Sequence, residues 1–365
     1  MKTGPYSISR RHRLFAVLAF LVAEITSHPA QIGVADEIPP GEIASSLSEV
    51  LTEHSKHVEK LHSSFISGSA TAMQSYHRKA NLPALPIGAT PPLPDNQPHL
   101  EDAIHSDFAS DARTGRLYCT YQTESSVCKF SNGEEIKSQN QPLDFKTIVR
   151  PDGYWTVNAH DQSQLPENVR AVNRATVAEV QSPAAALGDA KFGRIVDPHH
   201  LLGENPHDQF SDWLSRCIRF CDRQPADSLP VMVTTEGDRL IITVRVGPSS
   251  RPVMLSQYTI SREPPHLPLS YQRKLLPSGQ TVSSVEWAFQ ESEVGLFPWM
   301  IEVTHQEGQR EERRWIHKTL TITNLKISQE PIDESLFDLN TIGIKEGARV
   351  YHRDVGETRI YKEKR

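Results

Sequence analysis

The stretches TVSSVEWAFQ (281–290) and FPWMIEVTH (297–305) decide the fold. Large apolar residues alternate over 285–289 in the first stretch and over 299–303 in the second. These residues are Val285, Trp287 and Phe289 in the first stretch and Trp299, Ile301 and Val303 in the second. A two-residue period is typical of a β-strand that buries one face. Two such strands in succession indicate a sheet that supplies much of the hydrophobic core.

Strands of the same kind fill the chain from residue 229 to its end. Short turns separate them, at Glu236–Gly–Asp238, at Pro277–Ser–Gly279 and around Gly308. The hairpins expected from these turns join 231–235 to 239–246, 269–276 to 281–290, and 297–305 to 313–328. Consecutive strands joined by tight turns predict an antiparallel meander.

Helical spacing is confined to three segments, 42–66, 168–180 and 210–221. Shorter strand patterns lie between the first two, at 115–122, 126–130, 145–150 and 154–158. A helix, a few strands, two helices and a long run of strands make an α+β protein. We therefore predict a curved antiparallel β-sheet, an incomplete barrel, with helices packed on its concave face.

The N-terminal residues have the pattern of a secretory signal peptide. Arg10, Arg11 and Arg13 precede an apolar run over 14–23, and small and polar residues follow to Ala35. We assign residues 1–35 to this signal and expect a periplasmic or secreted protein. An uncleaved anchor that ends at Glu24 is the alternative, although the run is shorter than the ~20 residues that span a bilayer.

The chain has four cysteines, Cys119, Cys128, Cys217 and Cys221. An even number in an exported chain fits disulfides, and all four are disulfide candidates. Cys119 and Cys128 lie in an expected hairpin, where cross-strand neighbours come within disulfide range. Cys217 and Cys221 are four residues apart on an expected helix. Three pairings remain open.

Charge and motifs exclude several functions. The net charge of −6 at pH 7 argues against nucleic acid as a partner, because nucleic-acid binders carry basic patches. His199–His200 followed by Cys217 and Cys221 matches no zinc-ligand spacing, so we predict no metal site. The sequence has no phosphate-binding glycine loop and no Gly-x-Ser-x-Gly elbow. We therefore expect neither a cofactor nor an enzyme.

The C-terminal pattern resembles the outer-membrane lipoprotein carrier (LolA-like) superfamily, in particular its larger exported members of undefined role. The resemblance rests on the strands at 239–246, 256–261, 281–290, 297–305 and 320–328, and on the closing segment PIDESLFDL (331–339). It implies a half-barrel closed by a helical lid, with a cavity for an acyl chain. We accordingly expect a half-barrel domain over 36–340, with a Pro-rich loop at 81–98, and a tail over 341–365 with a last hairpin.

The candidate lining residues of such a cavity are Trp287, Phe289, Trp299 and Ile301. The function expected is non-enzymatic binding of a lipid or other apolar group. A first alternative is an interaction or scaffold module with a filled core, whose Pro-rich loop makes the contact. A second is a hydrolase with an unrecognised site. Peripheral contact with a membrane and the oligomeric state stay open.

Overall fold

The computed structural model describes residues 36–77, 99–123, 127–129, 135–137, 144–158, 178–183, 196–203, 209–224, 229–247, 253–307, 314–330 and 333–362. The predicted signal peptide and the Pro-rich loop lie outside the described residues.

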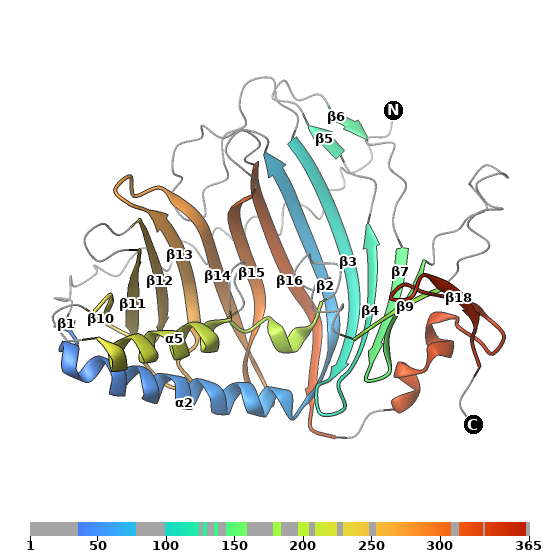
Figure 1. The fold of residues 1–365 in the computed structure, drawn as a ribbon, viewed down its shortest axis with the longest axis horizontal. Helices are drawn as coiled ribbons and strands as arrows, with labels where there is room; N and C mark the ends of the chain where they lie inside the picture. Colours follow the sequence, from blue (N-terminus) through green and yellow to red (C-terminus); the bar gives the residue numbers. More distant parts are fainter. Residues whose placement is uncertain are drawn as a thin grey trace, which may run out of the picture.

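The described residues form one large, curved, unclosed sheet of 18 strands (Figure 1). In chain order the strands are β1 (Asp36–Glu37), β2 (Phe65–His77), β3 (His99–Asp111), β4 (Arg116–Thr123), β5 (Val127–Lys129), β6 (Glu135–Lys137), β7 (Asp144–Arg150), β8 (Gly153–Asn158), β9 (Ala178–Gln181), β10 (Val231–Glu236), β11 (Arg239–Val246), β12 (Met254–Ser261), β13 (Pro268–Leu275), β14 (Thr281–Ser292), β15 (Gly295–Glu307), β16 (Arg314–Ser328), β17 (Arg349–His352) and β18 (Glu357–Ile360). The helices are α2 (Ile43–His62) and α5 (Phe210–Arg223), with short 3-10 turns η1 (Pro40–Glu42), η3 (Pro198–His200), η5 (Glu334–Phe337) and η6 (Leu339–Ile342).

The predicted antiparallel meander is confirmed. Strands β10 to β16 pair in chain order, each antiparallel to the next. All three predicted hairpins are present, as β10–β11, β13–β14 and β15–β16. The two-residue period and the turn residues were therefore sufficient to predict this half of the sheet.

The two halves of the sheet join where β16 pairs with β2. The pairing is antiparallel and runs from Trp315 opposite His77 to Ser328 opposite Phe65. Figure 1 shows blue β2 beside orange-red β16. Strand β2 continues through β3, β4, β7 and β8 to β9, so the first described strands extend the C-terminal meander into one surface.

Two sequence predictions are wrong. Residues 117–121 and 127–130 do not form a hairpin: β4 pairs with β3 and β7, whereas β5 pairs with β3 and β6. Strand β4 pairs with residues 104–111 of β3, and β5 pairs with residues 99–101. The two short strands therefore follow one another along the same edge of β3. The helix expected at 168–180 lies largely outside the described residues, and its end is strand β9.

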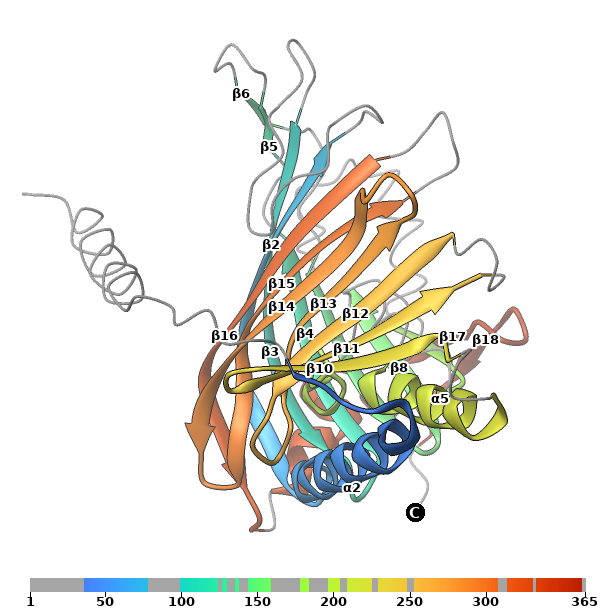
Figure 2. The same cartoon turned by 90° about the vertical axis from the view of Figure 1, so that its left-hand side faces the viewer.

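The other two predicted helices are confirmed as α2 and α5. They lie against each other and run across the sheet near one end of its strands (Figures 1 and 2). Phe210 and Trp213 of α5 pack on Tyr258 of β12, with ring centroids 4.8 and 4.7 Å apart. His54 of α2 meets Phe210 edge-on at 4.8 Å. Among the described residues, neither helix is sufficiently long and apolar to cross a membrane.

The C-terminal tail contains the predicted last hairpin, β17–β18. This hairpin packs at the edge of the sheet that ends in β9. Strand β17 adds to β9 in parallel. A second apolar cluster forms there, and it includes Trp155 and Val180 of the sheet with Ile342 and Val350 of the tail.

His54 gives the helix packing a pH dependence. Its side chain is 1 % exposed, and burial, followed by the charge of His57, lowers its pKa to about 4. Between pH 6.5 and about 4 the unfolded chain therefore binds a proton that the folded chain does not. The free energy of unfolding should fall as the pH falls through this window and level off below it.

We expect His54→Leu to reduce this loss by about 2 kcal/mol between pH 7.5 and pH 4.5, because each pKa unit is worth about 1.4 kcal/mol. Urea unfolding at the two pH values measures the loss. His105→Leu, at an exposed position, is the control. Equal pH dependence in the two variants would mean that His54 is not the group responsible.

Candidate functional site

One face of the sheet carries an apolar cluster that also includes residues of both helices. We call it the core face. Its cluster extends from Val231 and Val233 of β10 to Leu117 and Cys119 of β4, and it takes in Leu47 and Val50 of α2 and Phe210 and Leu214 of α5. The core face is thus a single apolar surface to which both halves of the chain contribute.

Five side chains form an unbroken line across this face, which we call the apolar row. In order across the strands they are Trp287 (β14), Ile301 (β15), Leu320 (β16), Ala72 (β2) and Ile104 (β3), each opposite the next in register. All five are between 5 % and 7 % exposed. Four inter-strand spacings of ~4.8 Å make the row about 19 Å long.

A polar row lies beside it, two residues further along three of the strands. Lys318 of β16 is opposite Gln74 of β2, and Gln74 is opposite Asp102 of β3. Side chains two residues apart on a strand share a face, at a separation of about 7 Å. An apolar strip and a charged strip therefore run in parallel on the core face.

Buried polar atoms on this face include some without a hydrogen-bond partner among the described residues. Three of them are Ser283 Oγ, Trp287 Nε1 and Asp102 Oδ1. A buried polar atom without a partner costs about 1–3 kcal/mol, and proteins normally satisfy such atoms with protein groups or bound molecules. These three atoms mark places where a polar group from outside the chain would be stabilised.

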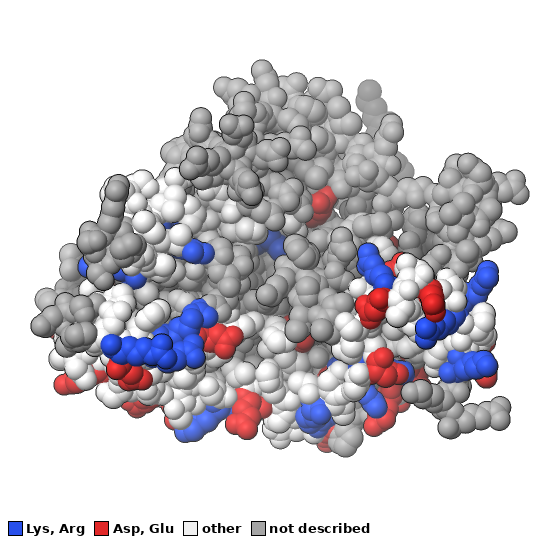
Figure 3. Space-filling model, viewed as in Figure 1, with Lys and Arg blue, Asp and Glu red and all other residues white. Residues whose placement is uncertain are grey.

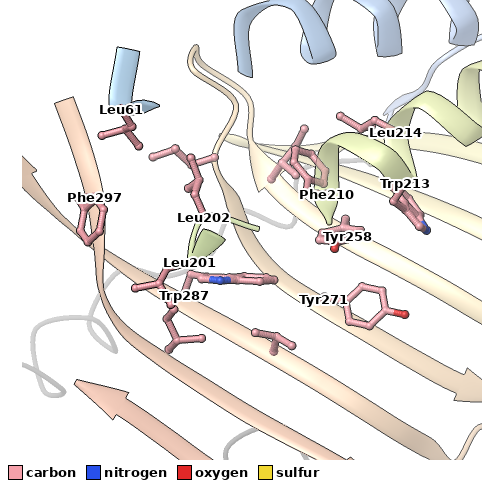
Figure 4. Close-up of a cluster of buried hydrophobic side chains, with 14 of the residues drawn as sticks. Leu61, Leu201, Leu202, Phe210, Trp213, Leu214, Tyr258, Tyr271, Trp287 and Phe297 are labelled. Carbon is pink, nitrogen blue, oxygen red and sulfur yellow. The ribbon is translucent and has the colours of Figure 1, made fainter. Parts of the chain in front are cut away.

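Aromatic rings fill the space between α5 and the sheet (Figure 4). Tyr258 is fully buried, and its ring centroid lies 4.8 Å from that of Tyr271 and 6.3 Å from that of Trp287. Phe210 and Trp213 close the cluster from the helix side. This part of the interior is filled by side chains of the protein itself.

Three of the four candidate lining residues lie at the apolar cluster of the core face, and the fourth does not. Trp287 and Ile301 belong to the apolar row, and Phe289 is half-buried against the same cluster. Trp299 falls in a β-bulge, between the pair Ala288–Met300 and the pair Phe289–Pro298, so it has no partner on β14 and does not join the cluster. The bulge breaks the two-residue period that grouped it with Ile301. Ligand contact by any of the four stays a prediction.

The thiols of Cys119, Cys217 and Cys221 are free. Cys119 lies opposite Phe108 and Thr147, which removes the hairpin that would have brought it near Cys128. The side chain of Cys128 lies outside the described residues. Burial raises the pKa of both Cys119 and Cys217 to about 12, so these two thiols are poor nucleophiles at neutral pH.

Sequence reasoning missed six members of the two rows, namely Leu320, Ala72, Ile104, Lys318, Gln74 and Asp102. These residues occupy every second position within 70–74, 102–104 and 318–320, which the sequence shows. Only the pairing of β16 with β2 brings them into register, and no local pattern predicts that pairing.

A separate surface hollow of about 280 Å³ lies beside η5, lined by Arg116, Arg150, Asp152 and Glu334 among others. Arg116 pairs with Glu334 at 3.1 Å, and Arg150 pairs with Asp152 at 2.6 Å. Because each guanidinium is already paired with a carboxylate, the hollow has little charge left for a ligand.

No protein-family model matches the chain, and no curated protein matches it either. Among solved structures, a DUF1329 family protein from Desulfovibrio piger is similar at a TM-score of 0.28 and 8% identity, over 81% of this chain and 98% of that one. Lipovitellin is similar at a TM-score of 0.27 and 7% identity, over 74% of this chain and 26% of that one. Likenesses this low carry no argument, so function is argued below from the geometry of this chain.

Ser283→Ala tests whether the Ser283 hydroxyl lacks a hydrogen-bond partner in the protein. Ser283 is fully buried, and removing a hydroxyl without a partner should leave the free energy of unfolding unchanged or raise it by about 1 kcal/mol. Ser256→Ala is the matched control, because its Oγ lies 3.3 Å from the Tyr271 hydroxyl and its loss should cost about 1 kcal/mol. Urea unfolding of lipid-stripped protein measures both, and an equal loss in the two variants would show that Ser283 has a partner in the protein.

Proposed function

We propose that this protein is exported and binds an amphipathic lipid, without catalysis, on the core face of its sheet. The apolar row would hold the acyl chain, and the polar row would meet the headgroup. The observation that carries the proposal is the pair of parallel rows, beside which buried polar atoms lack hydrogen-bond partners within the described part of the chain.

Chemical complementarity supports this ligand class. An extended acyl chain gains about 0.8 kcal/mol for each methylene removed from water, and the row is about 19 Å long. Lys318 of β16 and Asp102 of β3 lie on the same face of the sheet, with Gln74 of β2 between them. A zwitterionic or anionic headgroup with hydrogen-bond donors would find partners in that row.

We further propose that the core face is the concave side of the sheet and that α2 and α5 act as its lid, as the resemblance to the lipoprotein carriers implies. The basic, then apolar, N-terminal residues support export.

A filled core without a ligand is the second candidate, and the aromatic packing around Tyr258 favours it. In that case the protein would be an interaction module. The two candidates differ in whether the apolar row is accessible to an added lipid.

Ala72→Phe distinguishes them. A benzyl group in the middle of the apolar row should block the proposed site and weaken binding of a fluorescent fatty acid at least about tenfold, since lost burial of two methylenes alone gives that factor. Fluorescence titration of lipid-stripped protein measures the dissociation constant.

Met73→Phe is the matched control, because Met73 is the next residue on β2, on the opposite face, and is 47 % exposed. It should bind as the wild type does. Thermal unfolding of both variants separates a blocked site from a lost fold. A wild type that binds no fatty acid after stripping, or an Ala72→Phe variant that is folded and binds normally, would overturn the proposal.

A further inference from the structure

Helix α5 presents a cationic stripe away from the core. Arg216, Arg219 and Arg223 recur at three- and four-residue steps, which places them on one side of the helix, opposite buried Phe210, Leu214 and Cys217. Phe220 lies at the edge of this stripe and is 42 % exposed.

Two of the three arginines of this stripe, Arg219 and Arg223, are exposed to solvent. Neither of them forms an ion pair with a described carboxylate. Asp212 and Asp222 are the acidic residues of the helix, so its charge is positive overall.

Figure 3 shows Lys and Arg gathered over α5. The whole chain carries a net charge of −6 at pH 7, so this local positive charge is opposite in sign to the protein as a whole. The outward face of α5, with its arginines and the half-exposed ring of Phe220, is complementary in charge to an anionic lipid surface.

We propose that the outward face of α5 docks on an anionic membrane, with Arg216, Arg219 and Arg223 on lipid phosphates and Phe220 among the headgroups. Each arginine near an anionic surface strengthens binding about fivefold, and salt weakens that contribution. The proposal depends on the exposed face of α5 and not on a ligand at the core face. It can therefore hold where the proposed lipid site fails, and the reverse is also true.

Sedimentation with vesicles of phosphatidylcholine, with and without phosphatidylglycerol, tests the docking. The full chain should sediment with the anionic vesicles and lose that binding as salt is raised. Arg219→Glu with Arg223→Glu should weaken binding at least about tenfold, because it removes two positive charges and adds two negative ones. Phe220→Ser should weaken binding to a smaller extent and leave its salt dependence unchanged.

Lys345→Glu with Arg349→Glu is the matched control, because it makes the same charge change at exposed residues of the C-terminal tail. It should bind as the wild type does. If charge reversal on α5 impairs folding in a thermal melt, Arg219→Gln with Arg223→Gln replaces it. The proposal would be overturned if the wild type does not bind anionic vesicles. It would also be overturned if the α5 variants bind as tightly as the control variant. Salt-sensitive binding to an acidic protein without binding to vesicles would also overturn it.

Discussion

The pairing of β16 with β2 is the constraint on which the rest of the structure depends. It joins the C-terminal meander to the strands that follow α2, and it turns two sets of strands into one sheet. Without it, β2 and β16 would each expose a long row of unpaired backbone groups. The same pairing sets Leu320 beside Ala72 and Lys318 beside Gln74, so both rows of the core face exist only because of this register. A slip of one residue would send every one of these side chains to the opposite face.

The core face combines two kinds of interior. Around Tyr258 the rings of α5 and the sheet make ordinary aromatic contacts, and this region anchors the helices. Beyond Trp287 the face has smaller side chains, including Ala70 and Ala72, with a charged strip beside them. A face that served only as a core would gain more from apolar residues at Lys318 and Asp102. Their presence, together with Ser283 Oγ, is what favours recognition of a molecule with both an apolar and a polar part.

The sequence predicted those features that local patterns control. Alternation over 281–290 and 297–305 predicted the meander, and the spacing in 42–66 and 210–221 predicted both helices. Prediction failed where a choice between distant partners decided the outcome. Residues 127–129 pair with β3 instead of β4, and a bulge at Trp299 shifts the register of β15. The site depends on non-local pairing for the same reason: two residues of the apolar row come from β2 and β3, and the other three come from β14, β15 and β16.

Photolabelling with a fatty acid that carries a diazirine in its acyl chain tests the central claim most directly, because it reports which strands lie beside the ligand. The account requires label in peptides from β2 and from β16 together, at positions of the apolar row, with competition by unlabelled fatty acid. Label confined to peptides of α5 or of the C-terminal tail, or label that unlabelled fatty acid does not reduce, would contradict it.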